Sequence, residues 1–251
     1  MRRFSRSIPE ESILKIYDHL SVSEYRLYDT DTRISRDLIG PHGHMFQYVT
    51  WTHSGQSLIV VQNNNIYFKE SVSEQRSGEP FLPVTSSGKV GDIFNGVPDW
   101  LYGEEVLRRD NTIWLSLNDQ FLVYMEINDT GIPLIEMVHF SDPSNSYSEE
   151  QTLRYPKPGS PLPVLKLKVY NFPKNQTYVV STPRLFLNRS PYVTSLVWKN
   201  NVTFAVTWLS VHHNVSIIGI CSASSGFCYD NILLQSQIGW IDPVCLTPWS
   251  F

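Results

Sequence analysis

The sequence predicts an all-β protein, a partial β-propeller of four-stranded antiparallel blades with one short helical turn near residues 98–107. Three observations lead to this prediction. Aromatic residues make up 13% of the chain and charged residues only 18%, a balance that favours strands over helices. A unit of tryptophan, polar turn and apolar strand recurs. The one long irregular section is rich in proline, which a central strand does not tolerate.

The recurring unit appears three times. Its copies begin at Trp51, Trp114 and Trp198, so that successive tryptophans lie 114 − 51 = 63 and 198 − 114 = 84 residues apart. Repetition of a four-stranded unit with a tryptophan and a turn at a fixed place is typical of propeller blades. A β-sandwich is the structural alternative, but a sandwich does not require such a recurring unit.

The remaining elements are expected around these units. Residues 1–15 are expected to form a lead-in segment, and residues 16–251 one propeller domain. A hairpin is predicted about the turn at residues 29–33. The proline-rich section at about 132–163 is expected to be an extended arm or a rim loop, followed by a strand at residues 164–170 with clear alternation.

The segment from Gly91 to Leu107 differs from its strand-like neighbours. It places Pro98 and a single apolar turn before two adjacent carboxylates, Glu104 and Glu105. On one helical turn, adjacent side chains lie about 100° apart, so both carboxylates can lean into one cavity. Such a pair would receive a cation such as an amine. The alternative is a solvated glutamate pair on a surface turn, because glutamate is mostly exposed in proteins.

Several classes of function are disfavoured by what the sequence lacks. The net charge of −4 comes without a basic run, so nucleic-acid binding is not expected. There is no apolar run long enough to span a membrane, and no secretory signal is recognisable at the start. No Gly-x-Ser-x-Gly element or phosphate loop occurs, and the histidine pairs lack nearby cysteines, so no metal and no cofactor are expected.

Two features indicate an extracellular protein. Two of the three cysteines, Cys221 and Cys228, flank a glycine-containing turn between strand-like runs and are expected to form a disulfide across a hairpin. Cys245 is left over, so a partner outside this sequence is expected. The second half is rich in N-glycosylation sequons, and these without a signal suggest that the natural N-terminus is missing. The sequons are at Asn128, Asn175, Asn188, Asn201 and Asn214.

At this point the motifs resemble a known family. Phe94-Asn-Gly-Val-Pro-Asp-Trp-Leu-Tyr-Gly-Glu-Glu-Val106 is similar to the Asn-Gly-x-x-Asp-Trp-x-Tyr-Glu-Glu-Glu signature of the dipeptidyl peptidase IV family, in the prolyl oligopeptidase clan. Supporting motifs follow in the family's order, and the resemblance covers roughly residues 16–240. They are Ile127-Asn-Asp-Thr130, Arg154-Tyr-Pro-Lys-Pro-Gly159, Leu165-Lys-Leu-Lys-Val-Tyr-Asn171 and Asn214-Val-Ser-Ile217.

The resemblance implies a membrane-anchored or secreted serine exopeptidase that removes dipeptides from peptide N-termini. It implies the first three to four blades of an eight-bladed ring here, with the C-terminal α/β-hydrolase domain and its catalytic residues absent from this chain. Glu104 and Glu105 would bind the substrate's free ammonium group. The arm at 132–163 would take part in a homodimer, and membrane anchoring would need a missing upstream segment.

Two departures from the family pattern bear on activity. Asp18, next to His19, stands where the family enzymes carry an arginine that contacts the substrate, and Gly103 stands where they carry another glutamate. The signature also survives in non-catalytic relatives that act as potassium-channel auxiliary subunits. Three hypotheses therefore stay open: the recognition half of a dipeptidyl peptidase, a non-catalytic interaction subunit, and an unrelated propeller that binds ligands such as sugars.

Overall fold

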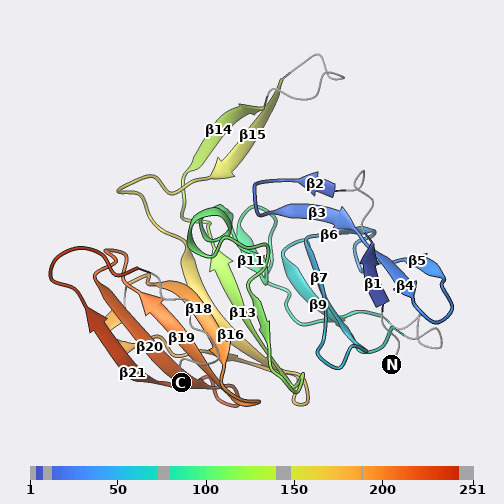
Figure 1. The fold of residues 1–251 in the computed structure, drawn as a ribbon. Helices are drawn as coiled ribbons and strands as arrows, with labels where there is room; N and C mark the ends of the chain where they lie inside the picture. The colour runs from blue at the N-terminus through green and yellow to red at the C-terminus, as the bar shows by residue number, and fades with distance from the viewer. Residues whose placement is uncertain (1–3, 8–12, 73–79, 140–147, 188, 243–251) are drawn as a thin grey trace.

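The protein is an open series of antiparallel β-sheets that follow one another in chain order (Figure 1). The structure is a computed structural model, and it describes residues 4–7, 13–72, 80–139, 148–187 and 189–242. The predicted fold class, an all-β partial propeller with four-stranded antiparallel blades, is confirmed, because the sheets are antiparallel and the series does not close into a ring.

The first part of the chain forms two small sheets. One has the order β1-β4-β5 and the other β2-β3-β6. The predicted hairpin about residues 29–33 is the β4–β5 pair. The segment expected as a lead-in contributes two strands, β1 and β2. The bounds are β1 Phe4–Ser7, β2 Ile13–Lys15, β3 Ser21–Glu24, β4 Arg26–Asp29, β5 Ser35–Asp37 and β6 Met45–Phe46.

Three larger sheets follow, with the orders β10-β9-β8-β7, β11-β13-β16-β17 (β12 also pairs with β13) and β18-β19-β20-β21. Their strands are β7 Tyr48–Trp51, β8 Leu58–Gln62, β9 Asn65–Lys69, β10 Leu82–Pro83, β11 Ile93–Asn95, β12 Ile113–Leu115, β13 Phe121–Asn128, β16 Val164–Asn171, β17 Gln176–Val179, β18 Tyr192–Trp198, β19 Thr203–Leu209, β20 Val215–Ser222 and β21 Cys228–Gln235. A short 3-10 turn, Arg184–Phe186, precedes the last sheet.

The recurring tryptophans occupy the same place in each of these sheets. Trp51, Trp114 and Trp198 each lie on the strand that pairs with the buried strand of the sheet, opposite Leu58, Val123 and Phe204 respectively. Neighbouring sheets are also joined through them, since Trp198 Nε1 donates to the Trp114 carbonyl at 3.3 Å. The repeat in the sequence therefore corresponds to a repeat in the structure.

The core lies between the sheets, because each central strand packs both of its faces. On β8, Leu58 and Val60 face the first part of the chain, while Ile59 and Val61 face the sheet that contains β12 and β13. On β13, Leu122 and Tyr124 meet β8, whereas residues on the other face meet the last sheet. Successive side chains of a strand point to opposite faces of the sheet, so a central strand can be buried on both faces.

The proline-rich section forms a separate two-stranded arm. Strands β14 (Leu134–His139) and β15 (Glu149–Arg154) pair only with each other and project away from the other sheets (Figure 1). The prolines beyond β15 accompany the chain back to β16 without strand pairing. The base of the arm meets the turn that precedes the glutamate pair, where the rings of Trp100 and Tyr155 lie 4.5 Å apart.

Candidate functional site

The predicted helical turn exists and carries the glutamate pair. It begins at Trp100 and continues as a π-helical turn, Tyr102–Val106. Asp99 fixes its start: its Oδ1 accepts the Tyr102 N–H at 3.0 Å, and its carbonyl accepts the Gly103 N–H at 2.9 Å. A buried carboxylate that accepts the first free N–H groups stabilises a helical start.

Glu104 is held by one residue from the first part of the chain. The His19 backbone N–H donates to its Oε1 at 2.9 Å, and the His19 ring Nδ1 donates to its Oε2 at 2.8 Å. The Glu104 side chain is 12% exposed and that of His19 38%. Because a carboxylate offers about four lone-pair positions, these two bonds fix the orientation of Glu104 and leave acceptor capacity for a ligand.

Glu105 is held differently from its neighbour. It is exposed, and no hydrogen bond or ion pair joins it to another residue in the described part of the chain. The two carboxylates are adjacent, as the sequence predicted, but the turn directs one against His19 and the other to solvent. The charge on Glu104 also reaches Tyr17, whose hydroxyl pKa is raised by burial and by that carboxylate.

A second acidic pair, which the sequence reasoning did not identify, lies behind the turn. Asp99 and Asp129 are 1% and 2% exposed. Burial raises the pKa of both carboxyls, and the charge of Asp99 raises that of Asp129 further. Asp129 is brought there by the β11–β13 pairing, in which its N–H donates to the Asp92 carbonyl at 2.8 Å.

An ion pair joins this region to the base of the arm. Arg154 on β15 donates through Nε and Nη2 to Asp92 Oδ1 at 2.7 and 2.6 Å, and through Nη1 to the Ile132 carbonyl at 2.8 Å. Lys89 also pairs with Asp92, and the hydrogen bonds from Lys89 and Arg154 lower the pKa of that carboxyl. These contacts span up to 62 residues of sequence, so they give no local sequence signal.

The two departures from the family signature have different structural settings. Gly103 is buried, and a Cβ there would lie 3.2 Å from Leu20 Cδ1 and 3.3 Å from Pro98 Cγ. A larger side chain at this position requires movement of Leu20. Asp18 is exposed and directly precedes the histidine that holds Glu104.

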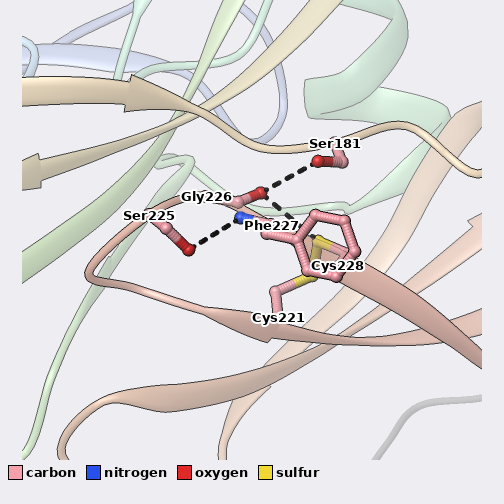
Figure 2. Close-up of a disulfide and its surroundings, with 6 residues drawn as sticks. All are labelled: Ser181, Cys221, Ser225, Gly226, Phe227 and Cys228. Carbon is pink, nitrogen blue, oxygen red and sulfur yellow. Dashed lines mark hydrogen bonds between the residues drawn. A yellow bond between two sulfur atoms is a disulfide. The ribbon is translucent and has the colours of Figure 1, made fainter.

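The predicted disulfide is present. Cys221 on β20 and Cys228 on β21 are register partners with their Cα atoms 4.1 Å apart (Figure 2). The turn between them depends on Gly226, whose φ is +73° and whose Cβ position would clash with the Val179 carbonyl. The Gly226 carbonyl accepts the Ser181 N–H at 2.9 Å, which ties this hairpin to the chain after β17. Cys245 lies outside the described residues.

The predicted glycosylation asparagines occupy turns and strand ends. Asn175, Asn201 and Asn214 are exposed, and Asn128 is half-buried at the end of β13, where its Oδ1 accepts bonds from the Thr130 N–H and hydroxyl. Asn188 lies outside the described residues. In the ranges that the structure describes, no three metal-ligating side chains gather and no helix is long and apolar enough to cross a membrane.

Comparison with known proteins places the chain. The sequence profile of the dipeptidyl peptidase IV (DPP IV) N-terminal region matches residues 8–247. The chain is 32% identical over 232 residues to inactive dipeptidyl peptidase 10 of Rattus norvegicus, covering 91% of this chain and 28% of that protein. It is also 32% identical over 248 residues to dipeptidyl peptidase 4 of Sus scrofa, covering 92% of this chain and 31% of that protein.

The fold agrees with this assignment. The crystal structure of Porphyromonas gingivalis dipeptidyl peptidase 4 superposes with a TM-score of 0.78 at 22% identity, covering 90% of this chain and 30% of that one. The chain thus spans less than a third of the length of these relatives. It belongs to the dipeptidyl peptidase IV family and corresponds to the N-terminal region of that family.

Proposed function

We propose that this chain is the part of a dipeptidyl-peptidase-IV-like serine exopeptidase that recognises the free N-terminus of a peptide. The observation that carries the proposal is the glutamate turn. Glu104 is oriented by His19 and lies beside Glu105, which is exposed. Two adjacent carboxylates favour a cation between them, and the α-ammonium group of a peptide is such a cation.

The arrangement would select peptides by their free end. A peptide whose amine is blocked offers no positive charge, so it leaves the two carboxylates repelling each other. An ammonium group fixed at this point also sets the distance to the second peptide bond, and such positioning lowers the barrier for a nucleophile supplied by another domain. The chain's own contribution is therefore binding and orientation.

The alternative function is a non-catalytic interaction subunit. The relative named inactive dipeptidyl peptidase 10 favours it, as does Asp18 at the position where the family's enzymes carry a substrate-contacting arginine. An acidic side chain there repels substrate carbonyl oxygens rather than binding them. The sequence encoded beyond residue 251 distinguishes the two functions. A nucleophile element of the Gly-x-Ser-x-Gly type there supports the exopeptidase, and a replaced nucleophile supports the interaction subunit.

Two further features of the family would follow from the proposal. Exposed sequon asparagines such as Asn175, Asn201 and Asn214 would carry glycans on an extracellular or secreted protein. The arm formed by β14 and β15 presents exposed Leu134 and Val138 and would contribute to a homodimer. Enzymatic deglycosylation followed by mass spectrometry, and sedimentation with and without the arm, test these points separately.

The test of the central proposal is peptide binding. A tetrapeptide that begins Ala-Pro is titrated by calorimetry into the wild-type chain, Glu104→Gln, Glu105→Gln and the double variant. Each single change is expected to weaken binding roughly threefold to tenfold, because each removes one ion pair at a partly exposed site. Glu136→Gln on the arm, also an exposed glutamate, is the matched control. Unchanged affinity in the double variant would overturn the proposal.

A further inference from the structure

A cavity lies next to the glutamate turn, but neither glutamate lines it. Its volume is about 440 Å³, within the range of small-molecule sites. Most of its lining comes from three segments: residues 16–21 at the start of β3, residues 90–100 around β11, and the base of the arm at Leu134 and residues 152–154. Glu104 and Glu105 are not among its lining residues.

The wall of this cavity is apolar and aromatic with an acidic excess. Tyr17, Phe94 and Trp100 supply the aromatic surface. Three carboxylates line it, Asp92, Asp110 and Asp129, against one guanidinium, Arg154. Aromatic faces and carboxylates in one enclosed site are the combination that binds organic cations.

The guanidinium does not neutralise this excess. Arg154 is already bound to Asp92 through two nitrogens and to the Ile132 carbonyl through a third. Its charge acts on Asp129 in the direction that lowers the pKa, but burial and the neighbouring Asp99 outweigh it and raise the pKa of Asp129 overall. Asp110 is occupied on one oxygen by the Asn111 amide at 2.7 Å.

Asp129 carries a side-chain oxygen without a hydrogen-bond partner among the described residues. The residue is 2% exposed, and its Oδ1 has no hydrogen bond within the described part of the chain. Leaving a buried carboxyl oxygen unsatisfied is costly, so a donor delivered by a ligand gains what the folded protein lacks. Asp129 lines the cavity, so a donor in the cavity can reach its carboxylate.

We propose that this cavity binds an organic ammonium ion with an aromatic or branched apolar body, with the ammonium group on Asp129 and the body against Tyr17, Phe94 and Trp100. The site is separate from the glutamate pair, and the inference does not depend on the proposed function. An acidic, mostly apolar cavity disfavours anions by charge repulsion and offers a neutral ligand no ion pair.

Binding of the ammonium ion would be linked to the release of a proton. In the free protein, Asp129 keeps its proton to higher pH than an ordinary aspartate because it is buried beside Asp99. When the ammonium ion binds, the proton leaves Asp129 for solvent and the carboxylate forms an ion pair with the ligand. Charge is conserved, since one cation enters and one proton leaves. Affinity is therefore expected to rise with pH until Asp129 is ionised in the free protein.

The experiment uses phenethylamine as the probe and 2-phenylethanol, its neutral counterpart, as the matched ligand. Both are titrated by calorimetry into the 251-residue chain carrying Glu104→Gln and Glu105→Gln, which removes the glutamate pair as an amine site. The amine is expected to bind at least about tenfold more tightly than the alcohol, with an affinity that increases from pH 6 to pH 8. Equal binding of amine and alcohol would overturn the inference.

Two variants locate the site. Asp129→Asn is expected to remove the pH dependence and most of the preference for the amine. Val90→Trp tests the same cavity without touching a buried residue, because Val90 lines it and is 71% exposed. The change is expected to block binding, whereas Val202→Trp, at an exposed valine before β19, is the control and is expected to bind normally.

The outcomes also separate this site from the glutamate pair. Amine binding that survives in Glu104→Gln/Glu105→Gln and disappears in Val90→Trp supports the cavity. Amine binding that disappears in the double glutamate variant and persists in Asp129→Asn and Val90→Trp overturns the cavity and assigns the amine to the glutamate turn. Loss of peptide binding at the glutamates therefore leaves the cavity inference standing, and the reverse also holds.

Discussion

Two pairs of acidic residues lie on either side of one turn, and they differ in how deeply they are buried. Glu104 and Glu105 face the surface, where one is oriented by His19 and the other is exposed. Asp99 and Asp129 are buried, and their carboxyls retain protons to higher pH than usual. The surface pair is adjacent in sequence, whereas thirty residues separate the members of the buried pair.

The difference points to separate contributions: the glutamate pair to peptide binding, and Asp99 to the stability of the turn. Glu105 is exposed, so a cationic ligand can approach the glutamate pair from solvent. In the buried pair, Asp99 fixes the turn by accepting the Tyr102 N–H, while Asp129 lines the cavity. Removal of the Asp99 acceptor should therefore alter stability, and changes in the glutamate pair should alter peptide binding with little effect on stability.

The largest expected effect is on the buried side. Asp99→Ala removes the acceptor of the Tyr102 N–H and leaves that donor buried without a partner, so the free energy of unfolding should fall by roughly 2 kcal/mol. Asp99→Asn retains an acceptor oxygen and should lose much less. Urea unfolding followed by tryptophan fluorescence measures both. Equal losses in the two variants would show that the hydrogen bond is not what Asp99 contributes.

The buried pair also predicts the direction of pH dependence. The unfolded chain loses its aspartate protons near pH 4, the ordinary carboxyl value of about 3.9, whereas folded Asp129 holds its proton to higher pH. Above that pH the folded state binds more protons than the unfolded state, so stability should fall as pH rises, until Asp129 ionises in the folded protein. Asp129→Asn should flatten this slope between pH 5 and pH 8. A wild-type urea midpoint that rises over this range would contradict the prediction.

On the exposed side, His19 should matter for binding more than for folding. His19→Ala frees the Glu104 carboxylate from its side-chain donor, and peptide affinity should fall a few-fold, about 0.5–1 kcal/mol as for a single hydrogen bond. Stability should change by less than about 0.5 kcal/mol because the imidazole is 38% exposed and the His19 backbone N–H still donates to Glu104. His19→Gln keeps a donor and should recover part of the affinity. Calorimetry at a fixed pH distinguishes the two variants.

The smallest effect is expected at Gly103, which lies in the turn between Asp99 and Glu104. Gly103→Ala gains helical propensity worth up to about 1 kcal/mol but places a methyl group 3.2 Å from Leu20 Cδ1. Because the leucine side chain can rotate, the two contributions should nearly cancel, with a net change within about 0.5 kcal/mol. A loss of 2 kcal/mol or more in urea unfolding would show that this position is too tightly packed for any side chain.

Much of the fold could be predicted from local sequence. The tryptophan units located the buried strands β8, β13 and β19, because alternation and turn residues act over a few positions. The Cys221–Cys228 hairpin was predictable for the same reason. Residues 1–15 gave no such signal, and their strands β1 and β2 arise from pairing with later strands.

The site was predictable in position but not in arrangement. The signature located the turn and both glutamates, but the π-helical geometry that orients them differently depends on tertiary contacts. His19 reaches Glu104 across 85 residues. Asp129 reaches Asp92 and Asp99 only because β11 pairs with β13. In the sequence, these aspartates are ordinary turn residues next to strands, and nothing local marks them as buried.

The central claim is that the glutamate pair, Glu104 and Glu105, recognises a free peptide N-terminus. Its most direct test is the ratio of affinities for one tetrapeptide beginning Ala-Pro, with a free and with an acetylated N-terminus, measured on the wild-type chain and on Glu104→Gln/Glu105→Gln. The account predicts a ratio of about ten or more for the wild type and a ratio near one for the double variant. A wild-type ratio near one would contradict it.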